Sequence, residues 1–119
     1  MQSYQLHVRV AQAVEFSAGH LGTILLPAGI YTYTGSARKN IYARVDRHLS
    51  SFKKLKWHID YLLLQEHVDV IGVRYSVREE CKLNQASDGD IVIQRFGATD
   101  CTQGCGSHLK LRRLLDQKK

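Results

Sequence analysis

Four side chains of the kinds that bind transition metals stand out in the sequence. Cys101, Cys105 and His108 follow one another at C-x₃-C-x₂-H spacing, and Cys81 lies further upstream. Thiolate and imidazole ligands suit tetrahedral Zn²⁺. This spacing is not the usual one of a zinc finger, so two interpretations stay open. The cluster is either a zinc site, or a set of buried thiols beside a loop histidine that borders a functional site.

Phenol, guanidinium and imidazole groups make a second set of reactive side chains. Tyr31 and Tyr33 stand two apart in a run rich in aromatic and β-branched residues, and taken alone this favours packing on a sheet face. Arg44 and His48 lie one helical turn apart. A guanidinium stays charged at any working pH and can grip a phosphate, while an imidazole can relay a proton.

Basic residues gather on both sides of Arg44 and His48 in the sequence. Lysine and arginine clusters commonly contact a phosphate backbone, although a solvated lysine-rich loop is the alternative. The formal net charge of +6 also favours a polyanionic partner. The candidate nucleic-acid contacts are Arg38, Lys39, Lys53, Lys54 and Lys56.

The spacing of apolar residues predicts the elements that position these groups. Residues 4–10 and 29–34 alternate as half-buried strands, and 68–76 is a third, β-branched strand. Ile41, Val45 and Leu49 recur every four residues and predict a helix over about 40–50. The remaining expectations are helices over 57–65 and 77–85, turn chemistry over 16–22, a possible strand over 91–97, a loop over 98–107 and a basic C-terminal tail.

Length and composition predict one soluble α+β domain over residues 1–119. A chain of 119 residues with 44% hydrophobic residues can bury one core, and the simplest layout is a small antiparallel sheet of about three strands flanked by helices. No apolar run has the length of a membrane span and no signal peptide is evident. Three cysteines cannot all pair within the chain. The expected compartment is therefore the cytoplasm.

Several motifs resemble those of the GIY-YIG endonuclease superfamily, small domains whose two short motifs lie on adjacent antiparallel strands. Gly29-Ile30-Tyr31 and Tyr33-Thr34-Gly35 cannot be the two motifs, because one intervening residue cannot turn a chain into a hairpin. The better assignment takes Ser3-Tyr4-Gln5 as the first motif and Tyr33-Thr34-Gly35 as the second. Ile41-x-x-Arg44, Arg44-x₃-His48 and Glu80-x-x-Leu83 then match in order.

Three further stretches, "GSA", "KWHIDYLL" and "FGATDC", are similar to an uncharacterised branch of the superfamily that is sometimes fused to repair glycosylases. The resemblance implies a hydrolase that cleaves DNA, branched or damaged, in repair. It implies that Glu80 holds Mg²⁺ or Mn²⁺, that Arg44 grips the scissile phosphate, and that Tyr4 and Tyr33 position the attacking water. His48 would touch the same phosphate or relay a proton. Tyr31 is assigned a packing role, and Glu79 is the alternative to Glu80 as the metal ligand.

Two departures from the superfamily pattern keep other functions open. The first motif has Ser3 and Gln5 around its tyrosine, and Ser36 stands where many members have lysine. The alternatives are a nucleic-acid-binding module of the same fold that has lost cleavage, and a zinc-stabilised interaction domain. A protein partner for targeting would suit a domain this small. His58 and Asp60 are expected to be polar residues at a helix start beside a buried Trp57.

Overall fold

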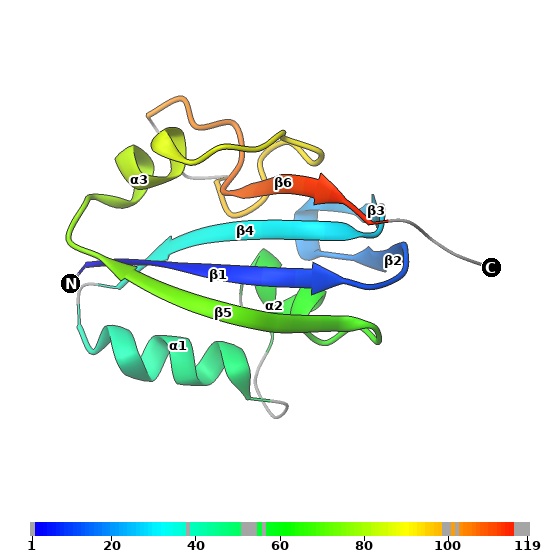
Figure 1. The fold of residues 1–119 in the computed structure, drawn as a ribbon, viewed down its shortest axis with the longest axis horizontal. Helices are drawn as coiled ribbons and strands as arrows, with labels where there is room; N and C mark the ends of the chain where they lie inside the picture. Colours follow the sequence, from blue (N-terminus) through cyan, green and yellow to red (C-terminus); the bar gives the residue numbers. More distant parts are fainter. Residues whose placement is uncertain are drawn as a thin grey trace.

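A four-stranded antiparallel sheet forms the centre of the computed structural model (Figure 1). The structure describes residues 2–37, 39–50, 55, 57–98, 101 and 103–115. In chain order the elements are β1 (Ser3–Val10), β2 (Val14–Ser17), a 3₁₀ turn (Gly19–Leu21), β3 (Thr23–Leu26), β4 (Gly29–Ser36), α1 (Ile41–Leu49), α2 (His58–Leu63), β5 (Val68–Ser76), α3 (Glu80–Ala86) and β6 (Leu109–Leu114). The α+β class expected from the sequence is confirmed.

The strands run in the order β5-β1-β4-β6, and every neighbouring pair is antiparallel. β1 and β4 pair over their whole length, with Tyr4 opposite Gly35 and Leu6 opposite Tyr33. Because directly opposed residues share a face of the sheet, Tyr4 and Tyr33 project to the same side. The expectation that these two stretches lie on adjacent antiparallel strands is therefore confirmed.

One face of the sheet carries the core. Alternation along β1 buries Tyr4, Leu6, Val8 and Val10. The β2–β3 hairpin and α2 cover this face with apolar side chains such as Phe16, Ile24, Leu26, Ile59 and Leu62. Figure 1 shows both elements behind the sheet. This packing fixes the depth at which the pocket side chains of β1 and β4 lie.

The helix after β4 differs in one position from the predicted stripe. Asn40 caps α1 through its side-chain oxygen, which accepts a hydrogen bond from the backbone N–H of Ala43. Ile41 and Val45 are buried as predicted, but Leu49 is 51% exposed and His48 is buried in its place. The predicted apolar stripe was therefore wrong at its last position. The seven residues from Ile41 to His48 fit two helical turns better than the eight from Ile41 to Leu49.

Two predictions about the other segments were wrong. The sheet has a fourth strand, β6, where only a basic tail was expected. Residues 91–97 form bends and turns rather than a strand. The turn chemistry predicted over 16–22 is confirmed by the 3₁₀ turn at Gly19–Leu21, while Phe16 and Ser17 belong to β2.

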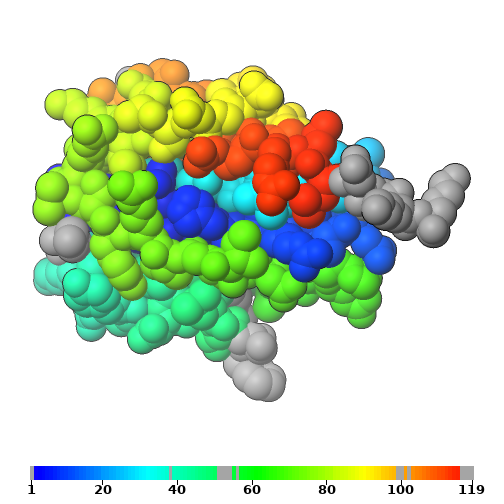
Figure 2. Space-filling model, in the orientation of Figure 1, coloured from blue at the N-terminus to red at the C-terminus, as the bar shows by residue number. Residues whose placement is uncertain are grey.

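The opposite face of the sheet is polar. Gln5 and Thr32 are buried there among hydrogen bonds, and the side-chain amide of Gln5 donates to Ser87 after α3. Figure 2 shows β1 (blue) at the surface between β5 (green) and β4 (cyan). Among the described residues no helix has the length and apolar character needed to cross a membrane.

Candidate functional site

A small polar pocket opens where the ends of β1 and β4 meet α1 and α3. Its volume is about 180 Å³. It is lined by Tyr4, Tyr33, Gly35, Ser36, Arg44, Trp57, Glu80 and Gly97. Four of the five side chains predicted to be catalytic therefore share one pocket, although they come from β1, β4, α1 and α3.

Gly35 lets the ring of Tyr4 lie flat across the neighbouring strand. A Cβ atom at position 35 would lie 2.5 Å from both Cζ and the hydroxyl oxygen of Tyr4, well inside van der Waals contact. The glycine of the Tyr-Thr-Gly motif is thus required by a close approach between strands.

The hydroxyl of Tyr4 lies 2.6 Å from Nε2 of His48. Both side chains are almost fully buried, at 1% and 2% exposure. His48 was predicted either to touch the phosphate or to relay a proton. It stands behind Tyr4, so its contact with the pocket runs through the phenol.

Asp60 stands behind His48 in turn. Nδ1 of His48 lies 3.6 Å from Oδ1 of Asp60, which is fully buried. Asp60 also accepts a bidentate pair of hydrogen bonds from Arg47 at 3.1 Å each, and one at 2.9 Å from the backbone N–H of Trp57. The expectation that Asp60 is a polar residue at the start of a helix is confirmed. Its place behind His48 was missed, because a contact between two helices has no signature in local spacing.

Burial dominates the acid–base character of the two phenols. It raises the pKa of Tyr4 above the ordinary value, and the nearby Arg44 guanidinium opposes this only in part. Burial also raises the pKa of Tyr33. A standing phenolate is therefore disfavoured at neutral pH. Tyr4 is instead a neutral hydroxyl with a hydrogen-bonded base, His48, at hand.

Arg44 is held at the pocket by two contacts. Its Nη1 donates to the carbonyl oxygen of Ser36 at 2.9 Å, and its guanidinium carbon lies 4.5 Å from the centre of the Trp57 ring. Arg47 stacks on the same ring at the same distance. The guanidinium of Arg44 thus faces the pocket, while that of Arg47 binds Asp60.

Glu80 links the pocket to the C-terminal loop. Its Oε1 accepts from the hydroxyl of Ser36 at 2.8 Å, and its Oε2 lies 2.9 Å from Nδ1 of His108. Burial would raise the pKa of Glu80, but the hydrogen bonds from His108 and Ser36 outweigh it and hold the pKa below its usual value. Each carboxylate oxygen has a second acceptor position, so a hard cation could still bind. The rival Glu79 is exposed and caps α3, where it accepts from the N–H of Cys81.

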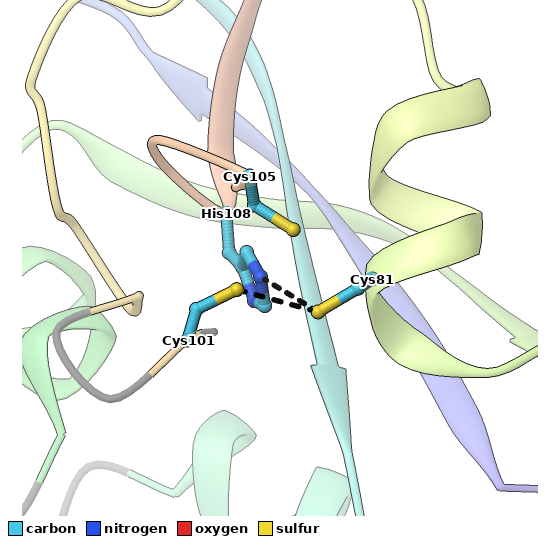
Figure 3. A group of neighbouring side chains, drawn as sticks. All are labelled: Cys81, Cys101, Cys105 and His108. Carbon is cyan, nitrogen blue, oxygen red and sulfur yellow. Dashed lines mark hydrogen bonds between the residues drawn. The ribbon is translucent and has the colours of Figure 1, made fainter. Parts of the chain in front are cut away.

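Four metal-binding side chains meet beside Glu80 (Figure 3). Sγ of Cys81, Cys101 and Cys105 and a ring nitrogen of His108 all lie within 4.8 Å of one another. Cys81 comes from α3, His108 lies directly before β6, and the other two lie in the loop between them. This Cys₃His cluster could hold a metal ion.

The acid–base state of the cluster is uneven. Burial would raise the pKa of Cys101. Hydrogen bonds from the backbone at Cys105 and Gln103 outweigh this effect and lower the pKa to about 6. Burial and the neighbouring cysteines raise the pKa of Cys81. Burial would lower the pKa of His108, but its hydrogen bond to Glu80 outweighs this and raises the pKa to about 9. One thiolate is therefore favoured at neutral pH even without a metal.

The remaining predicted residues lie elsewhere. Tyr31 is fully buried and donates to the carbonyl of Pro27 at 2.7 Å, in agreement with a packing role. Lys39 is exposed just before α1. Arg38, Lys53, Lys54 and Lys56 fall outside the described residues. Ser36, Trp57 and Gly97 line the pocket without having been predicted as site residues.

Comparison with protein families matches residues 3–118 to a family described as a domain of unknown function, DUF123. No curated protein and no solved structure matches the chain.

Proposed function

The chain belongs to the DUF123 family, and from the residues that line its pocket we propose that it is a divalent-metal-dependent endonuclease acting on DNA. The observation that carries the proposal is the meeting of Tyr4, Tyr33, Arg44 and Glu80 in one pocket. These groups are the parts that phosphodiester hydrolysis needs: a positive group for the phosphoryl oxygens, a hydroxyl beside a base, and a carboxylate.

The chemistry follows from the contacts behind each group. Arg44, held by Ser36 and Trp57, binds the non-bridging oxygens of the scissile phosphate. An attacking water gives its proton to the hydroxyl oxygen of Tyr4 as the hydroxyl proton passes to Nε2 of His48, 2.6 Å away. The new P–O bond forms as the bond to the leaving oxygen breaks. The leaving oxygen takes up a proton from solvent. His48 later releases to solvent the proton that it accepted from Tyr4.

Two residues hold this arrangement without touching the phosphate. Asp60 faces Nδ1 of His48 and favours the tautomer whose Nε2 can accept a proton. Tyr33 lies edge-on to His48, with ring centres 6.3 Å apart, and limits its movement. Both are positioning residues.

Glu80 is the group that would hold Mg²⁺ or Mn²⁺. The donor set fits, because carboxylate oxygens suit these ions and they are commonly bound by one or two carboxylates together with substrate phosphates. When bound, the cation neutralises charge on the phosphoryl group and on the leaving oxygen.

The test compares two adjacent carboxylates. Nicked, flapped, branched and plain duplex DNA are incubated with the wild type, Glu80→Gln and Glu79→Gln in Mg²⁺ or Mn²⁺. We expect the wild type and Glu79→Gln to cleave at least one substrate, and Glu80→Gln to lose about 10²-fold or more of the rate. Cleavage that survives Glu80→Gln would contradict the role of this carboxylate.

A nucleic-acid-binding module that has lost cleavage is the second candidate. The observation in its favour is the low exposure of the two pocket phenols, 1% for Tyr4 and 5% for Tyr33, which leaves little of either for a substrate to touch. Salt-sensitive DNA binding without cleavage of any substrate in the panel would select this candidate. DNA repair and a cytoplasmic location are consistent with either candidate.

A further inference from the structure

We propose that Cys81, Cys101, Cys105 and His108 bind one Zn²⁺ in a closed tetrahedral site, and that His108 ties this ion to Glu80 in the pocket. The zinc site stands on its own geometry. Only its consequence for cleavage rests on the proposed nuclease function.

The spacing of the four ligand atoms fits a tetrahedral ion. Sγ of Cys81 lies 3.5 Å from Sγ of Cys101 and 3.9 Å from Nε2 of His108. Zn–S bonds of about 2.3 Å and Zn–N bonds of about 2.0–2.1 Å place tetrahedral ligands about 3.5–3.8 Å apart. No pair in the cluster exceeds 4.8 Å. Small side-chain movements would therefore complete the site.

The orientation of His108 is the one that a metal ligand requires. Nδ1 faces Oε2 of Glu80 at 2.9 Å, while Nε2 faces the sulfur atoms (Figure 3). The Nδ1–H donates to the carboxylate, so that a metal which displaces the Nε2 proton finds the Nε2 lone pair directed at it. Carboxylate, histidine and metal in this order form a common arrangement in zinc proteins, in which the carboxylate fixes the ring and strengthens the ligand.

Hydrogen-bond donors surround the sulfur atoms. The backbone N–H of Gln103 points at Sγ of Cys101 at 3.4 Å, and the side-chain amide of Gln85 points at Sγ of Cys105 at 3.5 Å. Such donors stabilise thiolates, which are the form that binds metal. A disulfide between Cys81 and Cys101 would use only two of the four groups and would not explain the inward Nε2.

The choice of zinc follows from the ligand types. Three thiolates and one imidazole select a soft or borderline ion, and four protein ligands leave no open position for substrate. The ion is therefore structural. It would join α3 to the loop before β6, which otherwise meet through hydrogen bonds such as that from Asn84 to the carbonyl of Ser107.

Cobalt binding tests the site directly. The full chain, purified without a histidine tag and kept reduced, is stripped of metal with a chelator and titrated with Co²⁺. We expect saturation at one equivalent, with the intense visible bands of tetrahedral cobalt and a sulfur-to-cobalt charge-transfer band for three thiolates, and displacement by Zn²⁺. A weak octahedral spectrum, or a Cys81–Cys101 disulfide formed in place of metal binding under reducing conditions, would overturn the proposal.

Ligand variants and the untouched wild type give independent checks. Cys105→Ser should reduce the charge-transfer intensity to that of two thiolates. If this variant does not fold, the wild type still decides the matter, because removing a structural zinc must lower the melting temperature and restoring it must raise it again. A wild type whose melting temperature is the same with and without Zn²⁺ would contradict a structural ion.

The link to Glu80 is tested by zinc affinity rather than by cleavage. Glu80→Ala should weaken Zn²⁺ binding about 10–100-fold, measured by competition with a chelating dye, because it removes the partner of His108. Glu79→Gln is the control, because it keeps an oxygen that can accept from the N–H of Cys81, and it should keep the wild-type affinity. Equal affinities for Glu80→Ala and the wild type would refute the link. Since no DNA is present, this result does not depend on whether the protein is a nuclease.

Discussion

The hydroxyl of Tyr4 and Nε2 of His48 lie 2.6 Å apart in the interior of the protein, at the inner end of the pocket. The two residues are far apart in sequence, and they meet because α1 packs against β1. Burial keeps the phenol neutral, and the imidazole gives its proton a destination. Under the proposed function this pair accepts the proton of the attacking water.

Tyr4→Phe should lower the cleavage rate about 10²–10⁴-fold, which is the usual contribution of a positioned acid–base group, while DNA affinity changes little. Tyr31→Phe is the matched control, because it also removes a buried hydroxyl that makes one hydrogen bond. Single-turnover rates at saturating DNA measure the difference. Equal losses in the two variants would show that Tyr4 acts only through stability.

His48→Gln separates a proton-relay role from a packing role. If His48 accepts the proton of Tyr4, its protonation sets the acid limb of the pH–rate profile, and the variant should lose that limb. A histidine that only packs would leave the shape of the profile unchanged and lower the rate equally at all pH values. The rate is measured over the whole pH range in which both proteins stay folded.

Arg44→Lys should lower the rate at saturating DNA about 10²-fold, although the charge is kept. Lysine cannot reproduce the planar stack on Trp57 together with the hydrogen bond to Ser36, so its ammonium is not held at the pocket. Lys39→Ala is the contrasting variant, because Lys39 is exposed outside the pocket. It should weaken DNA binding and reduce the salt slope by about 0.9. A normal saturating rate in Arg44→Lys would contradict the phosphate role of Arg44.

The sequence predicts best what depends on neighbours along the chain. Alternation placed Tyr4 and Leu6 on the buried face, and the impossibility of a one-residue hairpin located the two tyrosine motifs on separate strands, which do pair. The pairing register of Tyr4 with Gly35 was not predicted, because alternation fixes the face of a residue and not its partner on the next strand. Helix α1 was also expected, apart from the exchange of Leu49 for His48 on its buried face.

What could not be predicted depends on contacts between distant segments. β6 alternates weakly and looks like a basic tail, because only its pairing with β4 makes it a strand. Cys81 and His108 meet because the loop between α3 and β6 brings the chain back to α3, and local spacing contains no sign of that return. The same holds for Asp60 behind His48. Irregular C-x₃-C-x₂-H spacing therefore said little about a cluster whose fourth member comes from a separate helix.

Gly35→Ala should destabilise the fold by about 1–3 kcal/mol and displace the Tyr4 ring from His48. The added Cβ would lie 2.5 Å from the Tyr4 ring, which cannot retreat into a packed core. Gly72→Ala is the matched control in β5, on the other side of β1, where a Cβ would meet His7 at 3.5 Å, an ordinary contact. Urea unfolding compares the two. Equal stabilities would show that Tyr4 can move at no cost.

Alkaline pH should destabilise the protein, and this loss of stability should be smaller in Tyr31→Phe. Burial raises the pKa of Tyr31 in the folded state, so the stability that its neutral form contributes is complete below the unfolded pKa near 10 and is lost as pH rises above it. At pH 7 the variant should be less stable by about 1 kcal/mol, because the hydrogen bond to Pro27 is gone.

At pH 11 the difference in stability between the Tyr31→Phe variant and the wild type should vanish or change sign. The wild type then loses about 1.4 kcal/mol through Tyr31, since one pH unit above the unfolded pKa is worth that much, and the variant does not. Tyr4 and Tyr33 titrate in both proteins and cancel in the comparison. Tyr42→Phe, at a phenol that is 57% exposed, is the control. An equal change with pH in the Tyr31 and Tyr42 variants would contradict burial as the cause.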